Sequence, residues 1–148
     1  MCLPLTPYRI EKEWKHAGLS CAVVQANEAS HRCGYVRVPP THPLFGTDYD
    51  DFDVDVHGGL TFADIESCTE HEDGQGWWFG FDCAHCMDMH YDPNADLAQL
   101  SPEGRRLLEI FSSFHPMPGQ HFWTQAEVEA ECERLAEQLS AKGSACRY

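Results

Sequence analysis

Short apolar runs bounded by turn residues dominate the first 90 positions and predict β-strands. The first such segment, residues 10–25, is best interpreted as two strands that turn at Ala17-Gly18. A short helix over 9–16 is the alternative. The run CGYVRV is rich in β-formers and stops at Pro39-Pro40. The apolar run WWFGFDC, bounded by glycine, is typical of a buried strand. The regions expected to form strands are 10–25, 33–38, 52–56, 60–65 and 77–83.

The last third of the chain changes to a helical period. Ser101 followed by Pro102 is a favourable helix start, and Thr124-x-x-Glu127 is a capping box that predicts a second start. Gly143 supplies the expected stop of that second helix. The first apolar face comprises Leu107, Leu108, Phe111 and Phe114, and Pro116, Pro118 and Gly119 are expected to end it; the second face comprises Val128, Cys132, Leu135, Ala136 and Leu139.

Strands followed by helices indicate an α+β fold. We expect a small antiparallel sheet with one or two C-terminal helices packed on it. The chain reads as a single domain over 1–148, in which 1–9 is a loose arm, 10–90 is mainly strands and loops, and 101–142 is helical. Pro4 and Pro7 block regular structure in the arm.

The charge of the chain limits the classes of partner that it can bind. The 148 residues carry a formal charge of −14, from 24 acidic and 10 basic side chains. Such a chain cannot neutralise phosphates, so we expect no direct binding of nucleic acid. A protein partner with a basic surface is compatible with this charge, as is simple solubility. The sequence does not indicate an oligomeric state.

No apolar run is long enough to cross a bilayer, and the N-terminus lacks the pattern of a secretion signal. We therefore expect no membrane association and a location in a reducing cytosol. The chain has eight cysteines, and in that compartment thiols or metal ligands are expected in preference to disulfides.

The segment WWFGFDCAHCMDMH contains the most metal-like spacing. Cys83-x-x-Cys86 is one half of a structural zinc site, and His85 and His90 lie close in sequence. A second such pair, which a structural site normally has, is missing from the chain. We therefore expect less than one equivalent of tightly bound zinc. The alternative is that Cys83 ends a core strand and Cys86 is incidental.

A carboxylate–imidazole site is a second interpretation. If 52–56 and 77–83 are neighbouring strands, alternation of side chains places His57 and Asp82 on a common face, with His85 just beyond. We expect His57 and Asp82 to lie within hydrogen-bonding reach, directly or through one water. Such a set is a candidate ligand group for a divalent metal ion such as zinc, which would activate water. The alternative is a polar pair that only fixes the turn.

Cys83 is also a candidate nucleophile, with His57 or His85 as its base and Asp82 as the orienting group. The flanking sequences of cysteine proteases are absent, and the acidic neighbourhood does not favour a thiolate.

Residues 48–55 form an acidic segment. It carries five carboxylates, no cation and two interleaved aromatic rings. It is either a solvated loop that leads into an edge strand or a recognition patch for a basic partner, with the rings as anchors. The candidate binding residues are Asp48, Tyr49, Asp50, Asp51, Phe52, Asp53 and Asp55.

Three segments in this order, HRCGYVRVPPTHPLFGTDYDD, VHGGLTF and WWFGFDCAH, resemble a family of small, uncharacterised proteins from bacteriophages and prophages. The resemblance covers roughly residues 31 to 88 and brings no activity with it. It implies a phage accessory protein located in the cytoplasm of a host bacterium. The metal- and charge-bearing residues within the matching segments are His31, Cys33, His42, Asp50, Asp51, His57, Asp82, Cys83 and His85.

Two functions follow from the sequence. The first is a small acidic accessory protein that binds a host factor, for example as an inhibitor of a defence component. The second is a metal-dependent hydrolase built on His57, Asp82 and His85. The sequence does not decide whether the protein is an enzyme.

Overall fold

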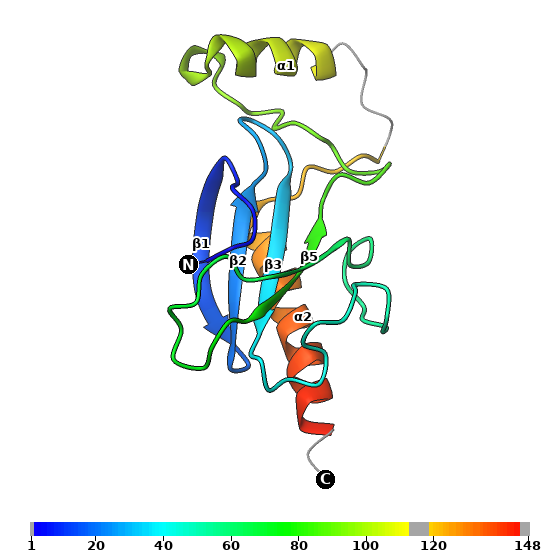
Figure 1. Ribbon diagram of the computed structural model, residues 1–148. Helices are drawn as coiled ribbons and strands as arrows, with labels where there is room; N and C mark the ends of the chain where they lie inside the picture. Colours follow the sequence, from blue (N-terminus) through cyan, green and yellow to red (C-terminus); the bar gives the residue numbers. More distant parts are fainter. Residues whose placement is uncertain (1, 113–118, 146–148) are drawn as a thin grey trace.

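The computed structural model describes residues 2–112 and 119–145, which form a five-stranded antiparallel sheet and two α-helices (Figure 1). This confirms the α+β expectation. The order of strands across the sheet is β1-β2-β3-β5-β4. The elements are β1 (Arg9–His16), β2 (Leu19–Gln25), β3 (Arg32–Val38), β4 (Phe62–Ile65), β5 (Trp77–Asp82), the 3₁₀ turn η1 (Leu97–Gln99), α1 (Pro102–Ser112) and α2 (Gln125–Ala145).

The β1–β2 hairpin turns at Ala17 and Gly18, as expected. Both residues have positive φ, 52° and 79°. Positive φ at both central residues is what a two-residue turn needs to match the twist of its strands. The helix considered over 9–16 is therefore wrong.

The strand expected at 52–56 is also wrong, because that segment has no regular secondary structure and does not pair with the sheet. Its backbone finds partners on α2 instead. Asp55 N donates to Gln138 Oε1 at 2.7 Å, and Gln138 Nε2 donates to Asp55 O at 2.8 Å. A helix side chain thus satisfies the peptide groups that a neighbouring strand would have bonded. Within 60–65, the strand is limited to β4.

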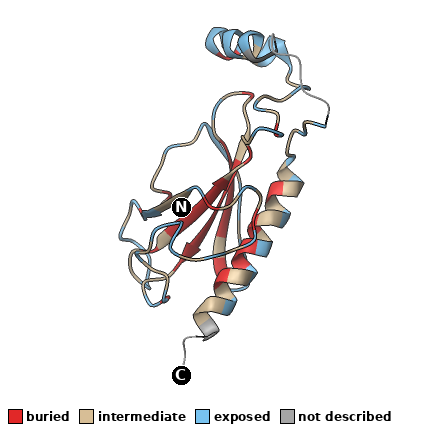
Figure 2. Cartoon of the chain, turned by 90° about the vertical axis from the view of Figure 1, so that its right-hand side faces the viewer, coloured by how far each residue is buried: buried red, intermediate tan, exposed pale blue. Residues whose placement is uncertain are grey.

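Helix α2 covers one face of the sheet, and Figure 2 shows its buried side turned toward the strands. Its capping box forms in both directions, with Glu127 N bonded to Thr124 Oγ1 at 3.2 Å and Thr124 N to Glu127 Oε1 at 3.1 Å. All five residues of the expected stripe are fully buried against the sheet. Burial of the Val and Leu side chains contributes about 1.5–3 kcal/mol each.

Gly143 is the expected end of the helix, but the helix continues to Ala145. The glycine instead makes room for a histidine. A Cβ at Gly143 would lie 3.0 Å from two ring atoms of His42, which is tighter than side chains normally pack. The buried His42 accepts from Leu44 N at Nδ1 and bonds Leu139 O at 2.8 Å through Nε2.

The arm expected to be loose covers the opposite face of the sheet. Leu3 is buried there in a cluster with Val24, Tyr35 and Trp78. Cys2 forms a disulfide with Cys68, 66 positions along the chain. The expectation of thiols or metal ligands in preference to disulfides is therefore wrong for this pair. The free cysteines among the described residues are Cys21, Cys33, Cys83, Cys86 and Cys132.

Helix α1 begins after Ser101, whose Oγ accepts from Gly104 N at 3.0 Å, as expected. It lies beyond the end of the sheet (Figure 1), so of the two described helices only α2 covers a sheet face. Leu107, on its expected apolar face, is 44% exposed. Phe114, Pro116 and Pro118 and the side chain of Phe111 lie outside the described residues. Neither described helix has the length and hydrophobicity that a membrane span requires.

Candidate metal-binding site

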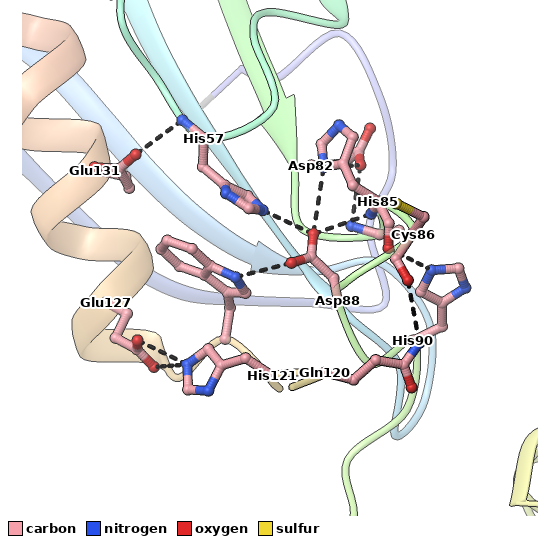
Figure 3. A network of polar contacts seen from close by, with 12 residues as sticks. His57, Asp82, His85, Cys86, Asp88, His90, Gln120, His121, Glu127 and Glu131 are labelled. Carbon is pink, nitrogen blue, oxygen red and sulfur yellow. Dashed lines mark hydrogen bonds and ion pairs between the residues drawn. The ribbon is translucent and has the colours of Figure 1, made fainter. Parts of the chain in front are cut away.

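Polar side chains from three separate parts of the chain meet at the end of β5 (Figure 3). His57 comes from the turn before β4. His85 and Asp88 come from the loop after β5. Trp123 comes from the segment that leads into α2. The bridge between Asp88 and His121 holds the second and third of these parts side by side.

Asp88 is the centre of this group. Its Oδ2 accepts from His85 N at 3.0 Å and lies 2.7 Å from His57 Nε2 and 3.3 Å from His85 Nδ1. Its Oδ1 accepts from Trp123 Nε1 at 3.0 Å. The residue is only 3% exposed. Burial raises the pKa of the Asp88 carboxyl, but the bonds from His57 and from the His85 backbone lower it further, so the net pKa lies below its usual value.

The position of His57 is fixed from two sides. Its backbone N donates to Glu131 Oε1 of α2 at 2.8 Å. Its ring lies on the Trp123 indole, with a centroid separation of 4.1 Å. With the backbone held at α2, Nε2 of the ring reaches Asp88 Oδ2 (Figure 3).

The position of His85 depends on the first glycine of the HGG motif, residues 57–59. Gly58 has a φ of +69°, and a Cβ there would lie 2.0 Å from Cε1 of His85. The imidazole thus packs where any other residue would place its side chain. The two rings, of His57 and His85, meet edge to face at 5.2 Å.

One ligand atom from each of His57, His85 and Asp88 lies within 4.8 Å of the other two. Two ligands about 2.0 Å from a tetrahedral zinc ion are about 3.3 Å apart. The His85–Asp88 separation already has this value, and the His57–Asp88 separation of 2.7 Å is shorter. The His57–Asp88 pair must therefore open for the group to hold a divalent ion, and two imidazoles with one carboxylate form a recurrent donor set for Zn²⁺ or Fe²⁺.

Contrary to one form of the expectation, Asp82 makes no direct hydrogen bond to His57; contact through a water stays a prediction. Oδ2 of Asp82 accepts from Thr61 Oγ1 at 3.2 Å and its Oδ1 from Ala84 N at 3.1 Å. The strand alternation of β5 is as expected, with Phe79, Phe81 and Cys83 toward α2 and Trp78 on the other face. The error lies in 52–56, which is no strand, so His57 reaches the α2 side. Asp82 stays beside the group, 3.8 Å from His85 Nδ1.

The cysteines of this loop point apart. Cys83 is 1% exposed in the core under α2, whereas Cys86 is exposed. Burial raises the pKa of the Cys83 thiol, and Asp88 raises it further, which opposes a role as nucleophile. His90 Nε2 bonds to His85 O at 3.3 Å. With His31, it lines a separate cavity of about 190 Å³ beside Leu107 and Leu108 of α1.

The acidic segment is solvent-facing in part. Its five aspartates are exposed, and Tyr49 is 41% exposed. Phe52 is half-buried and packs on the Phe79 ring at 5.1 Å, so it belongs to the core. Asp55 forms an ion pair with Arg134 of α2 at 3.0 Å.

No family model, curated protein or solved structure matches the chain. The geometry above therefore carries the functional argument. Sequence reasoning missed Asp88 and Trp123. The spacing His85-x-x-Asp88, which closes a turn with Asp88 N bonded to His85 O at 2.9 Å, was the available signal for Asp88.

Proposed function

We propose that His57, His85 and Asp88 bind a divalent transition-metal ion that activates water, which makes the protein a small metal-dependent hydrolase. The observation that carries the proposal is the convergence of three ligand atoms, one from the turn before β4 and two from the loop after β5. Closed structural zinc sites have four protein ligands, whereas catalytic sites have three and bind water in the remaining position.

The surroundings support metal binding as much as the ligands do. Trp123 donates to the second oxygen of Asp88, and the indole fixes the ring of His57. Hydrogen bonds of this kind orient metal ligands and raise affinity by about 10–100-fold. The side chains of His57 and His85 are 22% and 34% exposed, so an ion and its water have access from solvent.

Asp82 has a role in this proposal as a proton acceptor. A zinc ion lowers the pKa of bound water to about 7. Asp82 is close to His85 and 32% exposed, so its carboxylate is available to the water at the open position. A bound ion would supply the activated water, and Asp82 is placed to accept its proton.

Equilibrium metal binding tests the proposal. Zn²⁺ is titrated against a competing chromophoric chelator with the wild type and with Asp88→Asn, in protein first stripped of metal. Asp88→Asn keeps the shape of the side chain but removes its charge, and we expect it to weaken binding by at least about 100-fold. Cys86→Ser, which replaces an exposed thiol of the same loop, is the matched control and should bind like the wild type.

Hydrolysis is measured on chromogenic carboxylic and phosphoric esters. Metal-loaded wild type should release product, Asp82→Asn should lose rate while it retains metal, and Asp88→Asn should lose both. Wild type that binds no zinc overturns the whole proposal. Stoichiometric binding without hydrolysis of any ester overturns the enzymatic part alone.

A second candidate function rests on the acidic segment. We propose that a small phage-type accessory protein of this charge binds a host factor with a basic surface, as a counter-defence inhibitor would. The supporting observation is the run of exposed aspartates around Tyr49. Phe52 is excluded as an anchor because it packs on Phe79.

Replacing Asp48, Asp50 and Asp51 by Asn tests this second function. The three are exposed, so the free energy of unfolding should change by less than about 0.5 kcal/mol. Capture of a basic partner from host lysate should fall, and wild-type capture should weaken above about 0.15 M salt. Equal recovery by both baits would reduce the segment to a solvated loop.

A further inference from the structure

A second group of metal-binding side chains lies in the loop between β4 and β5. This loop carries Cys68-x-x-His71, and the N-terminal arm brings Cys2 to it. One ligand atom each from Cys2, Cys68 and His71 lies within 4.8 Å of the other two. The group shares no residue with the one around Asp88.

The disulfide is not the only contact that keeps Cys2 in this place. Leu3, the next residue, is buried against Trp78 and Tyr35 on the sheet. Ser67 N donates to Cys2 O at 3.1 Å, next to Cys68. The two cysteines therefore remain neighbours when the bond between their sulfurs is broken.

His71 is held by a buried carboxylate. Its Nε2 lies 3.1 Å from Oε1 of Glu66, whose side chain is fully buried. Glu66 is itself fixed by Arg37 Nε at 3.0 Å and by Gly76 N at 2.8 Å. A carboxylate at one ring nitrogen is the usual device that orients a metal-binding histidine and raises its basicity.

We propose that the reduced protein binds Zn²⁺ through the two thiolates of Cys2 and Cys68 and the imidazole of His71, and that oxidation to the disulfide excludes the ion. A dithiol reductant supplies two electrons and two protons to the S–S bond, which gives two thiols and oxidises the reductant to its own disulfide. Each thiol then loses its proton to water as the metal binds. Two thiolates on a tetrahedral zinc ion lie about 3.8 Å apart, within reach of side chains whose Cα atoms are 5.4 Å apart.

Surrounding charge favours a cation at this place. Glu70 and Glu72 flank His71 and are exposed, and Asp73 lies in the same turn. The positive charge of Arg37 is neutralised by its ion pairs with Glu66 and Asp73, and the Arg37 Nη2–Asp73 Oδ1 distance is 2.8 Å. The net charge around the sulfurs is therefore negative before the metal arrives.

Cobalt absorption separates this site from the first one. Co²⁺ bound by thiolate gives an intense sulfur-to-cobalt charge-transfer band in the near ultraviolet, which a site of imidazoles and carboxylate lacks. The experiment uses His85→Ala protein, which disables the first site, and compares its reduced and oxidised forms under anaerobic conditions. Zn²⁺ affinity is then obtained from displacement of cobalt.

We expect the reduced protein to bind one equivalent of Co²⁺ with a thiolate band and the oxidised protein to show no such band. Cys68→Ser should abolish the band, and His71→Ala should weaken binding by at least about tenfold. Cys86→Ser and His90→Ala remove exposed groups of the same types outside the cluster and should leave both unchanged. Because the comparison of redox states needs no further substitution, failure of a variant to fold does not affect it.

Absence of the band in the reduced protein would overturn the proposal, and so would its persistence in Cys68→Ser. Binding unchanged by His71→Ala would also overturn the proposed ligand set. None of these results bears on the site around Asp88, which contains no sulfur ligand.

Discussion

Gly58→Ala is the sharpest test of the group around Asp88, because it alters no ligand. The added Cβ would lie 2.0 Å from Cε1 and 2.3 Å from Nε2 of His85. Carbon atoms pack at about 3.5 Å or more, so the imidazole must retreat by about 1.5 Å. Metal–ligand distances tolerate only about 0.2 Å. His85 should therefore be lost as a ligand, and Zn²⁺ affinity should fall by at least about 100-fold.

The next residue provides a matched control. Gly59 has a φ of +79°, similar to that of Gly58, but a Cβ there meets nothing within 4 Å. Alanine in this backbone conformation costs about 1–2 kcal/mol at either position. Both variants should thus lose similar stability in the metal-free state, about 2–4 °C in Tm for each kcal/mol. Only Gly58→Ala should lose metal.

Competition against a chromophoric chelator measures affinity, and thermal unfolding by circular dichroism measures stability. Equal Zn²⁺ affinity in Gly58→Ala and Gly59→Ala would refute the reasoning, whether both variants bind more weakly than the wild type or both bind like it. It would mean that the Gly58–His85 contact does not position a ligand. A loss of stability much larger for Gly58→Ala, with affinity retained, would show that the contact serves packing alone.

Two further predictions concern other parts of the chain. Iodoacetamide at pH 8 should label Cys86 in the native protein but spare Cys21 and Cys33, because burial raises the pKa of both thiols to about 12. Labelling is measured by mass spectrometry, and equal labelling of all three cysteines would contradict the packing of the sheet. Glu66→Ala should lower the free energy of unfolding by about 1–3 kcal/mol in urea melts, since Arg37 keeps Asp73 but the buried Gly76 N and Trp78 Nε1 lose their acceptor. A loss below about 0.5 kcal/mol would contradict this.

The parts of the fold that sequence reasoning predicted correctly are those with local causes. The turn at Ala17-Gly18 follows from residues that accept positive φ, and the cap at Thr124 from a bond to a residue three positions away. The stripe of α2 follows from a period of 3.6 residues, and each of its members is buried. The turn, the cap and the position of the stripe on its helix do not depend on how distant segments meet.

The errors all involve distant partners. The alternation in 52–56 resembles a strand, but Gln138, 83 positions from Asp55, takes its hydrogen bonds. The pairing of Cys2 with Cys68 spans 66 positions and has no local signal.

For the same reason, the sequence predicted only His57 and His85 of the three candidate ligands. His57 and His85 follow closely after segments expected to be strands, which is a local property. Their carboxylate was assigned to Asp82 by the alternation of an assumed strand. Asp88 takes that place because its loop pairs with the segment before α2, where Met89 N donates to His121 O at 2.8 Å.

The two proposed metal-binding groups lie at opposite ends of one strand, and this separation makes them independent. Glu66 bonds Gly76, just before β5, while Asp82 ends β5 beside His85. Six strand residues span about 20 Å. Substitutions farther apart than about 10 Å, without shared partners, act additively. A variant in one group that changed metal affinity at the other would therefore imply that β5 or α2 had moved, and metal affinity at each site reports on the packing of a different end of the sheet.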